Sequence, residues 1–387
     1  MPRNSLHDIA IIATHNTRQA RRLEGENDMS LIMEAIRGVI AQAGIKATDI
    51  DGVNVNTPVW GLSPREASQL LGTQPRWVGN DFMGIAAVME AAGAIATGQA
   101  EMVLVGSAQA GEYGGGGAVA PWTRPTHEFV ESYGLYTAAE FAFSAQRHMH
   151  LYGTKQEALA EVAATVRNNG ARHPLASCYG KDPITADDVL ASRMVASPFH
   201  LLDCCLTSEG GAALLITTAE RARDLDVDPI YILGAGTDRQ GLSYTRAPVW
   251  DTYGAIGQRA AKRAYGQAGM GPGDIDVCEF YDPFSFEIIR QFETFGFCDL
   301  GEGGDFVMDG NIGLDGKFPI VTNGGLMSFG HAGTVQMLQK VIAAVEQLAG
   351  RVPDALKVPG AEVAMATNGG SAALFCDVMI LGREQLQ

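Results

Sequence analysis

The sequence has little charge and even less positive charge. Only 19% of its 387 residues are charged, and 28 Lys and Arg stand against 44 Asp and Glu, which gives a net charge of −16. Nucleic acids and anionic membranes require a cationic surface, so this composition argues against nonspecific binding to either. An anionic ligand would need a local positive patch. Sparse charge also suits a chain that buries part of its surface in an oligomer.

Long apolar runs are missing as well. No run approaches the roughly 20 residues of a membrane-spanning helix, and residues 1–12 lack the basic start and apolar core of a secretory signal. We therefore expect a cytoplasmic protein with no membrane span. Hydrophobic residues make up 46% of the chain, which is ample for two fused cores in an enzyme-sized protein.

Metal-binding patterns are also lacking. The six cysteines include no CxxC pair and no zinc-ribbon spacing, so we expect reduced, buried thiols, with packing as the default role of Cys204 and Cys205. His148 and His150 lie two residues apart on an expected helix and point to different faces, which indicates helix-packing and surface residues rather than a metal pair. We expect no intrinsic metal.

The sequence contains an internal repeat of one α/β unit. A Gln-Ala-Gly triplet at residues 42–44 is followed by Asp-Ile-Asp at 49–51, and both recur with the same spacing at 267–269 and 274–276. Each copy follows an amphipathic run and precedes an apolar stretch, which predicts a helix, a turn ended by glycine and a strand.

A second matched unit follows in each half. An apolar helix at 84–97 leads to a strand at 100–106, and a helix at 334–349 leads to a strand at 361–366. A duplicated α/β unit packs with pseudo-two-fold symmetry, which brings helix amino ends from both halves to one crevice. We expect the segments just ahead of the two apolar helices, 81–84 and 330–334, to face each other across one site.

A long insertion interrupts the first half from about residue 107 to 207. It contains a glycine run at 114–117 and helices expected at 138–151 and 156–168. The run lacks the Gly-Lys-Ser/Thr ending of a phosphate loop, which favours a cover over the site. Strand character resumes at 210–216, so the predicted halves are residues 1–222 and 223–387.

Five stretches together resemble the thiolase superfamily, in particular the sterol-carrier-type thiolases. They are residues 148–154, 198–205, 292–298, 301–304 and 323–331. The resemblance implies a duplicated, five-layered αβαβα fold around a buried helix layer, a homodimer and acyl-CoA substrates. Coenzyme A would then enter as part of the substrate, with no intrinsic cofactor.

The chain departs from thiolases where they carry their two reactive sulfurs. Thiolases place a nucleophilic cysteine at the head of the first buried helix, and Asp81 stands there. The second cysteine position falls near Asn368, Gly369 and Gly370, again without a thiol. A carboxylate nucleophile would form a reactive mixed anhydride. We therefore predict that Asp81 is the N-cap of the helix, with a chemical role as the alternative.

His331 lies between glycines just before the second apolar helix. The helix dipole disfavours imidazolium there and keeps a neutral ring that donates a hydrogen bond to a thioester carbonyl or accepts a proton. Gly330 allows a ligand to approach closely. The alternative is a histidine that caps a turn.

Tyr281 begins the motif at residues 281–287. A phenol here resembles the thiolase-fold aldolases that remove steroid side chains, which lack the thiolase cysteines and use a tyrosine at this motif. Those aldolases have a second tyrosine where this chain has His331, so the division of acid and base roles stays open. The alternative is an aromatic ring that closes the core.

A retro-aldol reaction suits these residues. Cleavage of a 3-hydroxyacyl-CoA with a bulky, steroid-like group needs a base, an electron-accepting thioester carbonyl and an acid, but no thiol. We assign Tyr281 and His331 to the proton transfers and the segment from Asn368 to Gly370 to carbonyl contacts. The alternatives are a thiolase-type acyltransferase with an unconventional site and an inert lipid-carrier or scaffold subunit.

The same resemblance implies a partner. Steroid-cleaving relatives commonly work with a separate small protein that combines a zinc ribbon with an oligonucleotide-binding-type (OB-fold) barrel and helps to hold acyl-CoA. This chain shows no obvious Lys/Arg cluster near its motifs, which is consistent with a phosphate-binding partner.

Overall fold

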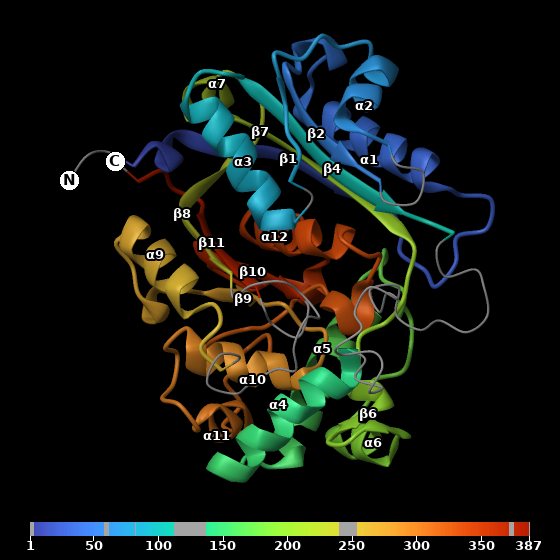
Figure 1. Cartoon of the computed structure of the whole chain (residues 1–387), viewed down its shortest axis with the longest axis vertical. Coiled ribbons are helices and arrows are strands. Elements are labelled where there is room, and N and C mark those ends of the chain that lie inside the picture. Colours follow the sequence, from blue (N-terminus) through green and yellow to red (C-terminus); the bar gives the residue numbers. More distant parts are fainter. Residues whose placement is uncertain are drawn as a thin grey trace.

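The structure is a computed structural model that describes residues 4–57, 62–81, 83–111, 137–239, 254–370 and 375–386. Its main sheet has nine strands in the order β3-β2-β4-β7-β1-β8-β11-β10-β9 (Figure 1). The strands are β1 (Ile9–Asn16), β2 (Gly52–Asn56), β3 (Trp77–Val78), β4 (Met102–Gln109), β7 (Gly210–Thr218), β8 (Ile230–Arg239), β9 (Val277–Glu279), β10 (Val363–Gly370) and β11 (Phe375–Gly382).

The sheet consists of two halves joined at one short ladder. Strands β3 to β1 come from the first half of the chain and β8 to β9 from the second, and β1 meets β8 through only Ala10↔Tyr231 and Ile11↔Ile230. Helix α1 (Asp28–Ala43) packs on β7, β1 and β4, and α9 (Gln258–Ala268) packs on β8 and β11. Each half therefore has its own outer helix.

Two buried helices form the middle layer. Helices α3 (Gly84–Ala96) and α12 (Val335–Leu348) pack on each other and on strands of both halves. Gly84 lies so close to α12 that a Cβ atom added to it would be 2.3 Å from the carbonyl carbon of Met337. The order of layers is α1, first half-sheet, α3 with α12, second half-sheet, α9. The predicted duplicated, five-layered fold is confirmed.

The repeated triplets perform the same local task in both halves. The Asp51 carboxylate accepts hydrogen bonds from the N–H groups of Glu101 and Met102, at 2.9 and 2.8 Å. The Asp276 carboxylate accepts from Glu362 and Val363, both at 2.9 Å. Each aspartate thus fixes the start of the strand that follows a buried helix.

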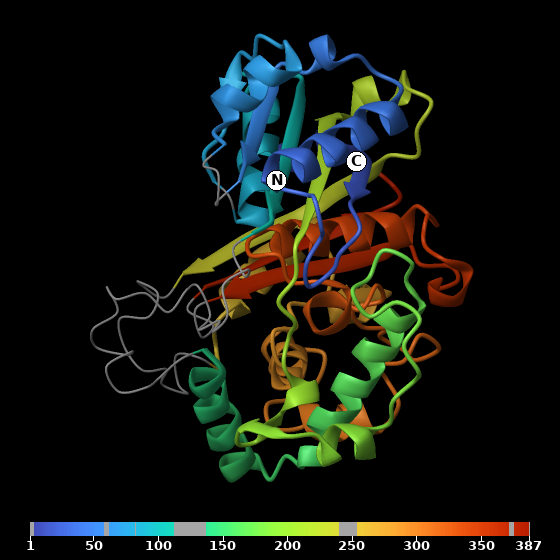
Figure 2. The same cartoon turned by 90° about the vertical axis from the view of Figure 1, so that its right-hand side faces the viewer.

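The insertion packs on the second half of the chain. Helix α5 (Gln156–Arg172) contacts α10 (Ser285–Thr294), α11 (Gly303–Met308) and the π-helix η6 (Gly325–Phe329), and Figure 2 shows these helices below the central layer. The remaining elements include α2 (Pro64–Leu71), α4 (Thr137–Tyr152), α6 (Ala186–Ala191), α7 (Ala219–Arg223), β5 (Met194–Ala196) and β6 (Phe199–His200). The glycine run at 114–117, expected as a cover, lies outside the described residues.

The described residues show neither a membrane helix nor a metal cluster. No helix among them is long and apolar enough to cross a membrane, and they contain no group of three His, Cys, Asp or Glu that could hold a metal ion. His148 is buried, and its Nε2 lies 2.9 Å from a Glu293 oxygen, whereas His150 is exposed. The two histidines point to different faces of α4, as expected.

Candidate active site

Tyr281 lies just beyond β9, and hydrogen bonds to its backbone hold it in place. Its N–H donates to Thr367 Oγ1 at 2.8 Å, and its carbonyl accepts from Gln291 Nε2 at 2.7 Å. Thr367 Oγ1 in turn donates to Gln291 Oε1 at 2.5 Å. The residue is 7% exposed. Strand β10 and helix α10 therefore fix the position from which the phenol projects.

The tyrosine ring lies against the glycine segment that was expected to contact the thioester. A Cβ atom on Gly369 would be 3.1 Å from Tyr281 Cδ1, a tighter contact than most side chains make, so a larger residue here would press on the ring. The neighbouring Asn368 is fully buried, and its Nδ2 donates to Asp377 Oδ2 at 3.2 Å. Its Oδ1 has no hydrogen-bond partner among the described residues. Gly370 ends β10, opposite Phe375.

His331 lies in the loop between η6 and α12 and is 6% exposed. Its N–H donates to Ser208 Oγ at 2.7 Å, and a Cβ atom on the preceding Gly330 would be 2.9 Å from the same oxygen. Burial lowers the pKa of His331 to about 4, assisted by the positive charge of Lys340. The imidazole is therefore neutral at physiological pH.

Cys205 is a contact of His331 that the sequence did not reveal. Its Sγ lies 3.2 Å from His331 Nδ1. Burial raises the pKa of Cys205 far above that of an ordinary thiol, and the negative charge of Asp282 acts in the same direction. The pair therefore consists of a thiol and a neutral imidazole, which is not the thiolate that cysteine nucleophiles require.

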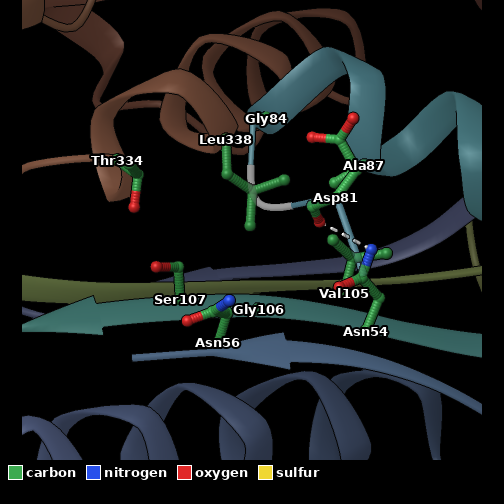
Figure 3. A pocket seen from close by; sticks show the side chains of 10 residues that line it. All are labelled: Asn54, Asn56, Asp81, Gly84, Ala87, Val105, Gly106, Ser107, Thr334 and Leu338. Atoms are coloured by element: carbon green, nitrogen blue, oxygen red, sulfur yellow. Dashed lines mark hydrogen bonds between the residues drawn. The ribbon is translucent and has the colours of Figure 1, made fainter. Parts of the chain in front are cut away.

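The prediction that Asp81 is the N-cap of α3 is wrong. Helix α3 starts at Gly84 with Met83 as N-cap, and the cap makes no side-chain hydrogen bond. Asp81 Oδ1 instead accepts from the Met83 N–H at 2.8 Å, so the carboxylate closes the turn before the helix. The Asp81 carbonyl accepts from Asn54 Nδ2 at 2.9 Å (Figure 3).

A cavity joins the two halves next to Asp81. The segments ahead of the buried helices meet here as expected, because Asp81 and Gly84 share the cavity with Thr334 (Figure 3). The other lining residues come from β2, β4, α3 and α12: Asn54, Asn56, Val105, Gly106, Ser107, Ala87 and Leu338. Both the Asp81 segment and the loop of His331 thus reach one site.

A buried ionic cluster lies behind the site. Lys340 Nζ on α12 is paired with Asp282, and Asp282 also accepts from the N–H groups of Leu326 and Met327 in η6 at 3.0 and 3.1 Å. Burial raises the pKa values of Asp282 and Glu279, and the charge of Lys340 opposes both shifts. The sequence signal that could have revealed this cluster is a lysine within an apolar helix.

Comparison with known proteins decides the family. Residues 237–383 match the model described as thiolase C-terminal domain-like. Over 343 residues the chain is 35% identical to the steroid side-chain-cleaving aldolase of Thermomonospora curvata, covering 82% of this chain and 85% of the relative. The chain belongs to the thiolase superfamily. The resemblance inferred from the five sequence stretches is thereby confirmed.

Two further similarities point to the same branch of the thiolase superfamily. The chain is 32% identical over 364 residues to the 17-hydroxy-3-oxo-4-pregnene-20-carboxyl-CoA lyase of Mycobacterium tuberculosis, covering 89% of this chain and 92% of the relative. The solved structure of the Ltp2-ChsH2(DUF35) aldolase matches with a TM-score of 0.84 at 30% identity, covering 97% of this chain and 98% of its own. The prediction of an aldolase-type lyase on a thiolase fold is confirmed.

Proposed function

We propose that this chain cleaves the CoA thioester of a bulky, steroid-like 3-hydroxy acid by a retro-aldol reaction. The observation that carries the proposal is the Tyr281 phenol beside Gly369, together with a neutral His331, in a thiolase fold that has neither thiolase cysteine. The names of the two relatives support a side chain attached to a steroid as the substrate class.

The reaction needs only proton transfers and an electron-accepting carbonyl. A base removes the proton of the 3-hydroxyl, the bond between C2 and C3 breaks, and the oxygen on C3 becomes a carbonyl. The electron pair moves to the thioester as an enolate, which an acid then protonates at C2. Tyr281 and His331 supply the base and the acid, and the segment from Asn368 to Gly370 contacts the thioester oxygen. No intrinsic cofactor is required.

The acyltransferase alternative has a specific weakness in this site. An acyl carrier must be a good nucleophile, and the thiol next to His331 belongs to Cys205, whose pKa burial raises. The inert-subunit alternative does not account for a neutral, buried histidine in a glycine-bounded loop. A carbon-carbon lyase uses both features.

We further propose a cytoplasmic homodimer that works with a separate protein. The name Ltp2-ChsH2(DUF35) aldolase joins a second component to an aldolase chain similar to this one, and we expect a partner built from a zinc ribbon and an OB-fold barrel. Strand β3 ends the nine-stranded order, and Val78 in it is 46% exposed. Among the described residues no strand pairs with the outer side of β3, and such an edge supports pairing with a second copy.

The decisive experiment is product analysis. The chain, alone and with a candidate zinc-ribbon partner, is incubated with a 3-hydroxyacyl-CoA that carries a bulky group on C3. Mass spectrometry should show a carbonyl product and the shortened acyl-CoA in equal amounts. Thiolysis of a 3-ketoacyl-CoA with no retro-aldol cleavage would instead establish the acyltransferase.

A further inference from the structure

The buried face of β4 changes from apolar to polar side chains along the strand. Val103 and Val105 pack in the core around α3 and α12. Because side chains of a strand alternate between its faces, Ser107 and Gln109 continue the same face. They are 5% and 2% exposed, and Ser107 Oγ and Gln109 Nε2 have no hydrogen-bond partner within the described residues. Burying unpaired polar atoms is unfavourable, so these two atoms require a hydrogen-bond partner beyond the described residues.

Ser107 borders the cavity that joins the two halves, together with Thr334. In Figure 3 the Thr334 side chain points toward Ser107 from the opposite side. Thr334 is the N-cap of α12 but makes no side-chain capping hydrogen bond, so its hydroxyl is available to a bound molecule. Asn54, Asn56 and Asp81 complete the polar lining.

The lining specifies the chemistry of the occupant. The hydroxyls of Ser107 and Thr334 can donate to an oxygen, whereas the Asp81 carboxylate offers oxygens that accept. The amino ends of α3 and α12 carry the positive end of the helix dipole, which disfavours a cation. A phosphate would be repelled by Asp81. An alcohol group is uncharged. Its oxygen accepts from the two hydroxyls, and its O–H donates to the Asp81 carboxylate.

We propose that this cavity is the subsite for the 3-hydroxyl oxygen of the acyl-CoA substrate, held by Ser107 and Thr334. The inference rests on the proposed function and extends it to the reacting oxygen. Thr334 lies three residues after His331, so a hydroxyl bound here lies at the end of the loop that carries a proton-transfer group. In the reaction the O–H bond breaks at this subsite, its proton passes to the base (Tyr281 or His331), and the carbonyl of the departing product forms as the C2–C3 electron pair moves to the thioester.

Binding of two inert ligands tests the subsite. We would use two CoA thioethers with the same bulky chain, one with and one without the 3-hydroxyl. Neither can be cleaved, because a thioether has no carbonyl to accept the electron pair. Calorimetry should show that the wild type prefers the hydroxylated ligand about tenfold or more, the effect of one well-made hydrogen bond to a buried group. Ser107→Ala should remove most of this preference and leave the affinity for the ligand without the hydroxyl unchanged.

Two further variants complete the test. Thr334→Val should reduce the preference in the same way. Thr217→Val is the matched control, because Thr217 lies at the other end of the same strand pair and its hydroxyl donates to the Glu101 carbonyl at 2.6 Å. This variant should keep the wild-type preference.

The outcomes separate the subsite from the proposed reaction. The subsite would be overturned if the wild type bound the two ligands equally well, or if Ser107→Ala changed the affinity for both ligands by the same factor. The cavity would then hold structural water only. A preference that depends on Ser107, with no cleavage of any 3-hydroxyacyl-CoA, would retain the subsite and reject the lyase.

Discussion

Lys340 forms an ion pair with Asp282, and both side chains are almost completely buried, at 2% and 0% exposure. Asp282 directly follows Tyr281, and Lys340 lies on the helix that begins just after the His331 loop. Asp282 also binds two N–H groups of η6, which leads into that loop. One buried ion pair therefore links the backbone segments that carry both candidate catalytic side chains.

Removal of the cation should destabilise the fold and change the titration of the site. Lys340→Met leaves the Asp282 and Glu279 carboxylates buried without their counter-charge, which should cost about 3–5 kcal/mol in urea unfolding. The Lys340 charge lowers the pKa of His331, so the acidic limb of kcat/KM should move to higher pH. Lys357→Met, which breaks an exposed pair with Asp354, is the control and should change stability by less than about 1 kcal/mol. An unchanged acidic limb in Lys340→Met would contradict the coupling.

Loss of either proton-transfer group should slow cleavage severely. Tyr281→Phe and His331→Ala should each reduce kcat by about 10²- to 10⁴-fold while the fold is retained, because each removes one acid or base. Tyr265→Phe is a suitable control, since the Tyr265 hydroxyl donates to the Phe295 carbonyl at 3.2 Å from an outer helix. If Tyr281→Phe cleaves as fast as the wild type, the phenol is a packing residue only.

Thiol chemistry should be dispensable. Cys205→Ala should keep cleavage within a few-fold of the wild type, because the pKa of this thiol is raised by burial and the retro-aldol reaction needs no sulfur nucleophile. Thiolysis of acetoacetyl-CoA should be negligible in both proteins. Rapid thiolysis that disappears in Cys205→Ala, or after alkylation of a cysteine, would show that Cys205 or another thiol carries the acyl group.

The pH dependence of activity should reveal a depressed histidine. Since the pKa of His331 is lowered to about 4, the ring is neutral down to well below its ordinary value of 6.5, and kcat/KM should not fall between pH 7 and about 5.5. The unfolded chain binds this proton more readily, so the neutral ring contributes stability that is present above pH 6.5 and is lost as the pH falls toward 4. An acidic limb of kcat/KM near pH 6.5 that disappears in His331→Gln would show that the pKa of His331 is not lowered.

Glu140 on α4 should make the protein less stable at high pH. It is 1% exposed, its Oε2 has no partner in the described part of the chain, and burial raises its pKa to about 8. The folded state keeps a proton that the unfolded state releases above about pH 4.5, so this group should lower stability by about 1.4 kcal/mol per pH unit up to pH 8. Glu140→Gln should remove that slope in urea titrations at pH 5–8, and the exposed Glu34→Gln should not.

The sequence determined the architecture because the signals that encode it are local. Gly44 and Gly269 end their helices in left-handed conformation, with φ of 65° and 66°, and Asp51 and Asp276 bind N–H groups at the starts of matched strands. Such turns and caps depend on a few neighbouring positions and on the helical or strand period, which can be read along the chain. Tyr281 and His331 were found because their motifs resemble those of a known family.

The tertiary structure decided which side chains meet across the halves. Asp81 lost its predicted capping role because its carboxylate binds the N–H of Met83, the residue that itself caps α3. The contact of Cys205 with His331 joins residues that are 126 positions apart. Ser107 and Thr334 likewise share a cavity only because α12 packs against β4. Periodicity shows that a residue is buried but not what it is buried against, so these partners follow from packing alone.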